Sequence, residues 1–163
     1  MFPFRFIPPG AIYWLRPARS ADEGQAWREL PPALATPPGS GAVADAAGAR
    51  KIGRGAAEGY FTTGPVLVAH ASLTARRLGL AAPARNKNIL DLLELFAFVQ
   101  PAVFCAPSPT GLALALGRPE PTTVEDQAAL LRAAAAQLLD RLAEAAYRDR
   151  EAAYGLALTL ERA

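Results

Sequence analysis

Short apolar runs that end in a polar residue and pass into a helical pattern occur twice in the middle of the chain. The run at residues 65–69 ends at His70 before one such pattern, and residues 88–91 lead into the next. A buried strand followed by a polar residue and an amphipathic helix is the unit with which α/β domains place side chains at their strand ends. The pattern therefore predicts an α/β fold with a candidate site at these junctions.

The same periodicity, with glycine and proline as breaks, assigns the other elements. Apolar residues at positions 92, 95, 96 and 99 share one helical face, and Pro101 ends that helix. We expect strands over 42–45, 50–53, 65–70 and 88–90, the first two as a hairpin. We expect helices over 54–61, 73–78, 92–99, 111–116 and 150–161, and a long Ala/Leu helix after Thr123.

Polar residues at the starts of these helices are candidate caps. Ser72 and Thr110 each stand immediately before a short helix. The position pairs 122/125 and 123/126 each place a threonine three residues before an acid, which is the signature of a capping box. We therefore expect side-chain capping at all three helix starts.

Prolines concentrate in the first 38 residues, at positions 3, 8, 9, 17, 31, 32, 37 and 38. Because proline lacks an amide donor and fixes φ, this segment is expected to hold only short pieces of regular structure. We divide the chain into a Pro-rich N-terminal extension at 1–38, an α/β domain at 39–120 and a helical segment at 121–163. The last expected helix meets no stop signal, so we expect the chain to continue into a longer protein.

Composition and charge narrow the class of protein. The 163 residues are 52% apolar, which excludes global disorder, and the net charge is only +2. Of the basic residues, only Lys51 and Lys87 are lysine. The arginine excess is interpreted as the codon bias of a GC-rich genome, with a phosphate-binding surface as the alternative.

The single Cys105 can form neither a disulfide within the chain nor a thiolate zinc site by itself. No apolar run approaches the roughly 18 residues of a membrane helix. The N-terminus lacks an early basic region and a cleavage site, so it does not resemble a signal peptide. We expect a cytoplasmic protein without a membrane partner.

Few residues are candidates for chemistry. His70 is the only histidine, and it is expected to bond backbone at a strand end unless the fold brings a carboxylate to it. Asp91 and Glu94 are expected to serve the start of a helix, as cap and first-turn acid. The glycines at 53, 55 and 59 imitate a nucleotide-binding turn, but their spacing is one residue too long. A Gly-Lys pair is absent, so the chain holds no Walker A loop.

The segments around these residues resemble the DnaQ-like 3′–5′ exonucleases. Residues 68–75 (VAHASLTA) are similar to that family's histidine motif, residues 90–95 (LDLLEL) to its next segment, and residues 112–117 to a later helix. Asp45 stands where the family's first strand carries Asp-x-Glu. The resemblance implies an RNase H-like (DnaQ-exonuclease-like) small sheet with flanking helices, followed here by the C-terminal helical segment.

The departures from that family concern its acids. The four carboxylates of those enzymes hold two metal ions that activate water. Here Ala47 replaces the glutamate, Thr74 or Ala75 stands at the second acid, and a second histidine is missing. The resemblance therefore implies a vestigial site at Asp45, His70, Thr74 and Asp91, without catalytic, metal-binding or cofactor-binding residues.

A longer resemblance covers nearly all of residues 35–163. Its most specific segment is LDLLELFAFVQP at 90–101. This part of the chain is similar to the N-terminal domain of alphaproteobacterial DinG-type ATP-dependent DNA helicases.

That resemblance implies a catalytically inert accessory domain that handles DNA or docks on a helicase core in cis. ATP and magnesium would belong to that absent core, which would be the hydrolase, and no small-molecule substrate is expected. The alternative is a stand-alone protein-interaction module without a nucleic-acid role.

Overall fold

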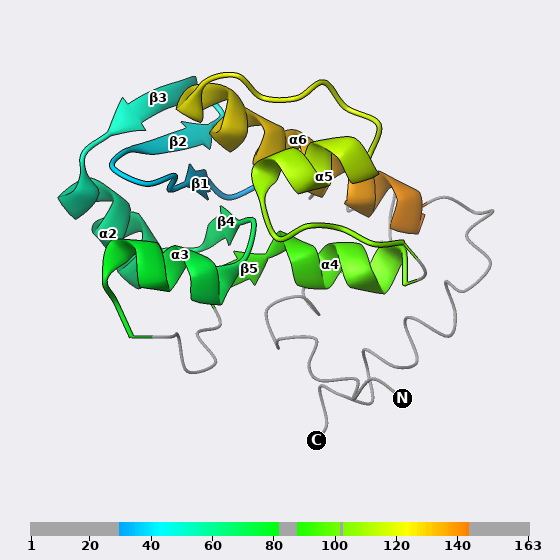
Figure 1. Ribbon diagram of the computed structural model, residues 1–163, viewed down its shortest axis with the longest axis horizontal. Helices are drawn as coiled ribbons and strands as arrows, with labels where there is room; N and C mark the ends of the chain where they lie inside the picture. Colours follow the sequence, from blue (N-terminus) through cyan, green and yellow to red (C-terminus); the bar gives the residue numbers. More distant parts are fainter. Residues whose placement is uncertain (1–29, 82–87, 102, 144–163) are drawn as a thin grey trace, which may run out of the picture.

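The computed structural model describes residues 30–81, 88–101 and 103–143, in which helices flank a small sheet (Figure 1). The strands are β1 (Ala33–Ala35), β2 (Gly41–Asp45), β3 (Gly48–Ile52), β4 (Val66–Val68) and β5 (Ile89–Asp91). The helices are α2 (Arg54–Thr63), α3 (Ala71–Leu78), α4 (Leu92–Val99), α5 (Pro109–Ala115) and α6 (Val124–Ala143). The expected α/β class is confirmed.

The described strands form one mixed sheet in the order β3-β2-β1-β4-β5. β1 is antiparallel to β2, and β2 is antiparallel to β3. On its other side β1 is parallel to β4, which is parallel to β5. The carboxyl ends of β1, β4 and β5 therefore lie at the same edge of the sheet, and that of β2 lies at the opposite edge.

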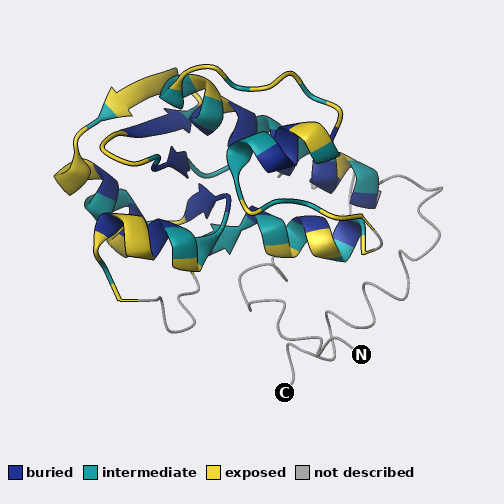
Figure 2. Ribbon diagram, viewed as in Figure 1, coloured by how far each residue is buried: buried dark blue, intermediate teal, exposed yellow. Residues whose placement is uncertain are grey.

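β2 and β3 form a hairpin in which β3 is the outermost strand on one side of the sheet. Gly48 has φ of 121°, a conformation that side chains disfavour, so glycine suits this tight connection. Asp45 also supports the turn by accepting a hydrogen bond from the Ala47 amide at 2.9 Å. β3 carries Arg50 and Lys51 and is exposed (Figure 2), which keeps an unpaired strand edge polar.

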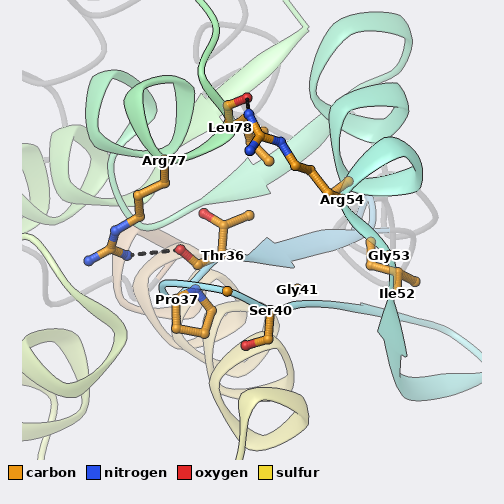
Figure 3. Close-up of a pocket in the computed structure, with 11 residues that line it drawn as sticks. Thr36, Pro37, Ser40, Gly41, Ile52, Gly53, Arg54, Arg77 and Leu78 are labelled. Carbon is orange, nitrogen blue, oxygen red and sulfur yellow. Dashed lines mark hydrogen bonds between the residues drawn. The ribbon is translucent and has the colours of Figure 1, made fainter.

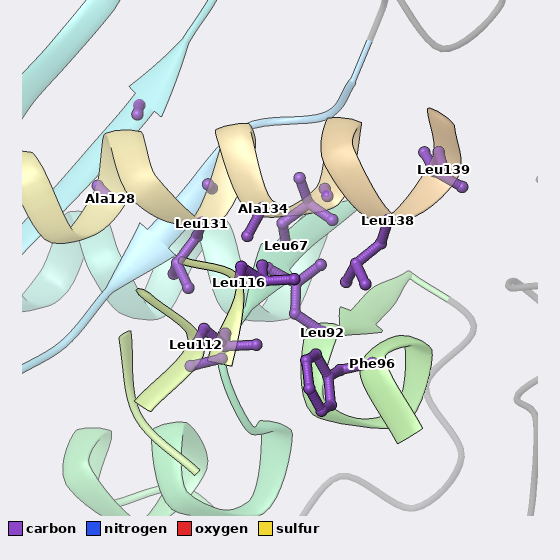
Figure 4. Close-up of a cluster of buried hydrophobic side chains, with 14 of the residues drawn as sticks. Leu67, Leu92, Phe96, Leu112, Leu116, Ala128, Leu131, Ala134, Leu138 and Leu139 are labelled. Carbon is purple, nitrogen blue, oxygen red and sulfur yellow. The ribbon is translucent and has the colours of Figure 1, made fainter. Parts of the chain in front are cut away.

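Alternating side chains of the central strands face two separate cores. Leu34, Val66 and Val68 pack on the face covered by α2 and α3. The neighbouring positions, Ala35 and Leu67 among them, pack on the face covered by α4, α5 and α6 (Figure 4). The sheet is therefore buried on both faces, which is typical where parallel strands occur.

The larger core joins the sheet to a leucine stripe on α6. Leu131 and Leu138 of α6 are fully buried, as are Leu92 and Phe96 of α4 (Figure 4). The face of β1 and β2 toward α6 is built from small residues: Ala33, Ala35, Ala42 and Ala44. Long side chains thus fill the space between the helices, and methyl groups line the contact between α6 and the sheet.

Strand β1 corrects the expected division of the chain. It lies inside the segment 1–38 that was expected to be an extension, yet it is the middle strand of the sheet and is fully buried. The compact part therefore begins earlier than residue 39. In the same way α6, expected in a separate helical segment, packs on β1 and β2.

The element predictions hold at most other places. The helix at Leu92–Val99 has the expected bounds, and the strands of the hairpin, β4 and β5 are confirmed within a few residues. The expected helix at 150–161 lies outside the described residues. None of the described helices combines the length and apolar character needed to cross a membrane.

The capping predictions are correct at one helix of three. His70 rather than Ser72 caps α3, and Ser108 rather than Thr110 caps α5. The capping box before α6 is confirmed by reciprocal bonds of 3.0 Å between Thr123 and Asp126.

Candidate functional site

The edge at which β1, β4 and β5 end is the candidate site. Thr36 follows β1, His70 follows β4 by two residues, and Asp91 ends β5. The β4–β5 register pairs Val68 with Asp91, so the two junctions expected from the sequence are neighbours in the fold.

Asp91 holds the starts of two helices together. Its Oδ2 accepts a hydrogen bond from the Ala71 amide at 2.7 Å, at the first residue of α3. Its Oδ1 accepts from the Leu93 amide at 3.0 Å and the Glu94 amide at 3.4 Å, at the start of α4. The side chain is only 8% exposed. The expected capping role is confirmed, and both carboxylate oxygens are occupied by backbone donors.

His70 lies beside Asp91 without forming a catalytic dyad. Its Nδ1 is 4.0 Å from Asp91 Oδ2, which is too far for a hydrogen bond. The same nitrogen accepts a hydrogen bond from the Leu73 amide at 3.4 Å and so caps α3. An Nδ1 that accepts a bond carries no proton, so it cannot donate to the carboxylate. The expected strand-end role, in which His70 bonds backbone, is confirmed.

Two carboxyl groups at this edge have raised pKa values. Burial raises the pKa of Asp91, against the opposing effect of the backbone amides that donate to it. The protein packed around Glu94 and the neighbouring Asp91 charge raise the pKa of Glu94 to about 7, although part of its side chain is exposed. Both pKa shifts arise because these carboxyl groups are crowded together at the start of α4.

The other two candidates for the vestigial site, Thr74 and Asp45, lie in different parts of the fold. Thr74 is buried in α3, one turn after His70, and its amide donates to the His70 carbonyl at 3.0 Å. Asp45 lies at the opposite edge, because it ends β2, which runs antiparallel to β1. There it pairs with Arg50 at 2.6 Å, and this hydrogen bond holds the pKa of Asp45 below its ordinary value. The expected position of Asp45 in the site is therefore wrong.

Strand β1, which contributes one of the strand ends at this edge, was not predicted from the sequence. β1 is Ala33-Leu34-Ala35, and it carries no acid. The signal that could have found it is an apolar triplet followed by the turn-forming segment 37–41. Across the described residues, no three side chains of His, Cys, Asp or Glu converge in a way that could hold a metal ion.

A cavity of about 180 Å³ opens at the same edge, on the α2 and α3 side of the sheet (Figure 3). Its walls come from the segment after β1, the end of β3, the start of α2 and the end of α3. The lining residues include Thr36, Ser40, Gly53, Arg54 and Arg77. None of the residues that line it is acidic, and two are arginines.

Comparisons with protein-family models, with curated proteins and with solved structures found no match. Function must therefore be inferred from the fold and from the residues at this edge.

Proposed function

We propose that the chain has an RNase H-like fold of the DnaQ-exonuclease type. The support is the strand order β3-β2-β1-β4-β5, with an antiparallel meander on one side of β1 and parallel strands on the other. The helices on both faces of this sheet agree with the arrangement that the resemblance implies. The resemblance of segments 68–75 and 90–95 to that family supports the same proposal.

We propose further that the domain is catalytically inert by itself. A two-metal nuclease needs several carboxylates that converge at the strand ends. At this edge β1 ends in Ala35 and is followed by Thr36, neither of which is an acid, and Asp91 uses both oxygens to bind backbone amides. The observation that carries the proposal is that Asp91, the carboxylate at these strand ends, is bound to the backbone amides that begin two helices.

The proposed role is that of an accessory domain of an ATP-dependent DNA helicase, which guides a DNA strand or docks on the motor. The segment 90–101 is the basis for the helicase part of the proposal. In this role the helicase core in cis would bind ATP and magnesium, and this domain would contribute weak, salt-sensitive affinity for DNA.

The first experiment tests both activity and DNA contact. The purified chain is incubated with labelled single-stranded DNA and magnesium or manganese, and the same DNA is used in a binding titration at low and high salt. We expect intact DNA and an affinity that decreases as salt rises. Hydrolysis that disappears in Asp91→Asn would contradict the inert role.

A second experiment tests the proposed helicase core: the codons after Ala163 should encode a Gly-x-x-x-x-Gly-Lys-Ser/Thr loop.

A protein-interaction module is the second candidate, and one observation favours it. Phe104, in the loop before α5, is 88% exposed, and Leu114, in α5, is 70% exposed. Exposed large apolar side chains are common at contact surfaces. This candidate is preferred if the chain binds no DNA at low salt and loses a co-purified protein when Phe104 and Leu114 are replaced by serine.

A further inference from the structure

The Nδ1 atom of His70 lies between two groups that it cannot bond in the same protonation state. On one side the Leu73 amide donates to it at 3.4 Å, and on the other Asp91 Oδ2 lies 4.0 Å away. The first contact needs a nitrogen with a free lone pair, whereas the second needs a nitrogen that carries a proton. The partner of His70 is therefore decided by whether its ring is protonated.

Asp91 is a buried carboxylate without a permanent cation beside it. Its side chain is 8% exposed, and the hydrogen bonds that it accepts come from backbone amides. Within the part of the chain that the structure describes, the only basic group that reaches it is the His70 ring, at 4.0 Å. Buried charges in proteins are usually paired. A proton on His70 would provide the positive charge that this carboxylate lacks.

A second acid makes the junction more negative. Glu94 follows Asp91 by three residues, and burial together with the Asp91 charge raises the pKa of Glu94 to about 7. When both carboxylates are ionised and His70 is neutral, two negative charges lie at the start of α4 beside an uncharged ring. Histidine is the side chain that ordinarily changes its charge between pH 5 and 8. The junction is therefore suited to take up a proton on His70 within this range.

The other charged groups on the elements around His70 lie away from it. β4 and α5 carry no charged residue. Arg76 and Arg77 belong to the last turn of α3, and Arg77 donates to the Thr36 carbonyl at 3.2 Å. On α2, Arg54 pairs with Glu58 at 2.9 Å. The balance of charge at the junction is therefore set by the ring and the two carboxylates.

We propose that His70 is a proton-operated switch at the start of α3. When the ring is neutral, it accepts a bond from the Leu73 amide and caps the helix. When the ring is protonated, it turns Nδ1–H toward Asp91 Oδ2 and leaves the Leu73 amide without its cap. The acid form ties the end of β4 to Asp91 and loosens the first turn of α3. This inference does not depend on the proposed function.

An NMR titration of the ¹⁵N-labelled chain from pH 8 to pH 5 tests the switch. At pH 8 the ring signals should show an Nδ1 without a proton and an Nε2 with one, and at pH 5 both nitrogens should be protonated. The Leu73 amide should lose its acceptor, so its proton signal should move upfield along the same titration curve as the ring. A proton on Nδ1 at pH 8, or a Leu73 amide that does not follow the ring, would overturn the proposal.

His70→Asn is the matched control, because asparagine caps helices and does not titrate. In this variant the Leu73 amide should no longer respond to pH. Glu94→Gln removes the neighbouring titration and should keep the response. A response that persists in His70→Asn, or that is lost in Glu94→Gln, would assign it to the carboxylates and overturn the role of His70.

Asp91→Asn tests the second partner of the ring. It keeps an oxygen that accepts from the backbone amides but removes the negative charge. The proton affinity of His70 should fall about tenfold, as expected for loss of a charge-assisted hydrogen bond. An unchanged titration midpoint would mean that the protonated ring does not pair with Asp91, and the switch would be overturned. Since the ring nitrogens are followed in the wild-type chain as well, the test does not depend on the folding of this variant.

Discussion

Replacing Asp91 tests whether the site edge is a structural junction. Its carboxylate accepts amide bonds from the starts of α3 and α4. A helix cap contributes about 1 kcal/mol and a hydrogen bond to a charged group about 1.5–3 kcal/mol. Burial, which raises the pKa of Asp91, offsets part of this gain. We therefore expect Asp91→Ala to lower the free energy of unfolding by about 2–3 kcal/mol.

Urea denaturation at pH 7, followed by circular dichroism, measures this loss. The melting temperature should decrease by roughly 5–10 °C for a chain of this length. Ser108→Ala is the matched control, because Ser108 caps a single helix through one neutral bond of 3.0 Å from the Gly111 amide. That variant should lose only about 1 kcal/mol. Asp91→Asn keeps one oxygen acceptor and should fall between the two.

The reasoning about Asp91 is refuted if Asp91→Ala loses no more stability than Ser108→Ala. Such a result would mean that the amides of Ala71 and Leu93 find water or other acceptors at no cost. An Asp91→Ala variant more stable than wild type would instead mean that burial of the charge outweighs its three hydrogen bonds. In that case the carboxylate would be retained for a role other than stability.

Three further variants test the larger core, the junction at Asp91 and the close approach of α5 to the loop before it. Leu138→Ala should cost about 2–5 kcal/mol in urea denaturation, because its side chain is fully buried in the larger core, whereas exposed Leu114→Ala should change stability by less than about 0.5 kcal/mol. Glu94 has a native pKa of about 7 against an ordinary 4.5, so the native state holds its proton more tightly and stability should fall as pH rises from about 4.5 to about 7. Thermal melts of Glu94→Gln across this range should show a flatter profile. Gly111→Ala should strongly reduce the folded fraction, since an added Cβ would clash with the backbone of the loop before α5, whereas Gly55→Ala, which meets open space, should not. A measured loss for Gly111→Ala no larger than that for Gly55→Ala would contradict the close approach at α5.

Local patterns were sufficient for elements that carry their own signal. The helix at Leu92–Val99 has its apolar residues on one face, an acid at its start and a proline after it, and its bounds were predicted. The capping box at Thr123 and Asp126 is equally local. Asp91 and His70 were expected to bond backbone at the junctions, and they do.

The predictions that failed concern features that depend on contacts between distant parts of the chain. β1 is three residues long and lies among prolines, so it shows neither strand alternation nor length. It is a strand because β2 and β4 pair with it on either side. Asp45 was placed in the site because its strand was taken as the first of the sheet. Once β1 is the first strand, β2 runs the other way and carries Asp45 to the far edge.

The alanine-lined contact between α6 and the sheet determines which changes the fold can accept. In the leucine core, truncation leaves a void, and that is the damaging change. Where α6 packs on the alanines of β1 and β2, little volume can be lost, but added methylenes would push a twenty-residue helix away from the sheet. Substitutions on this face must therefore occur in compensating pairs, and size rather than hydrophobicity limits variation there.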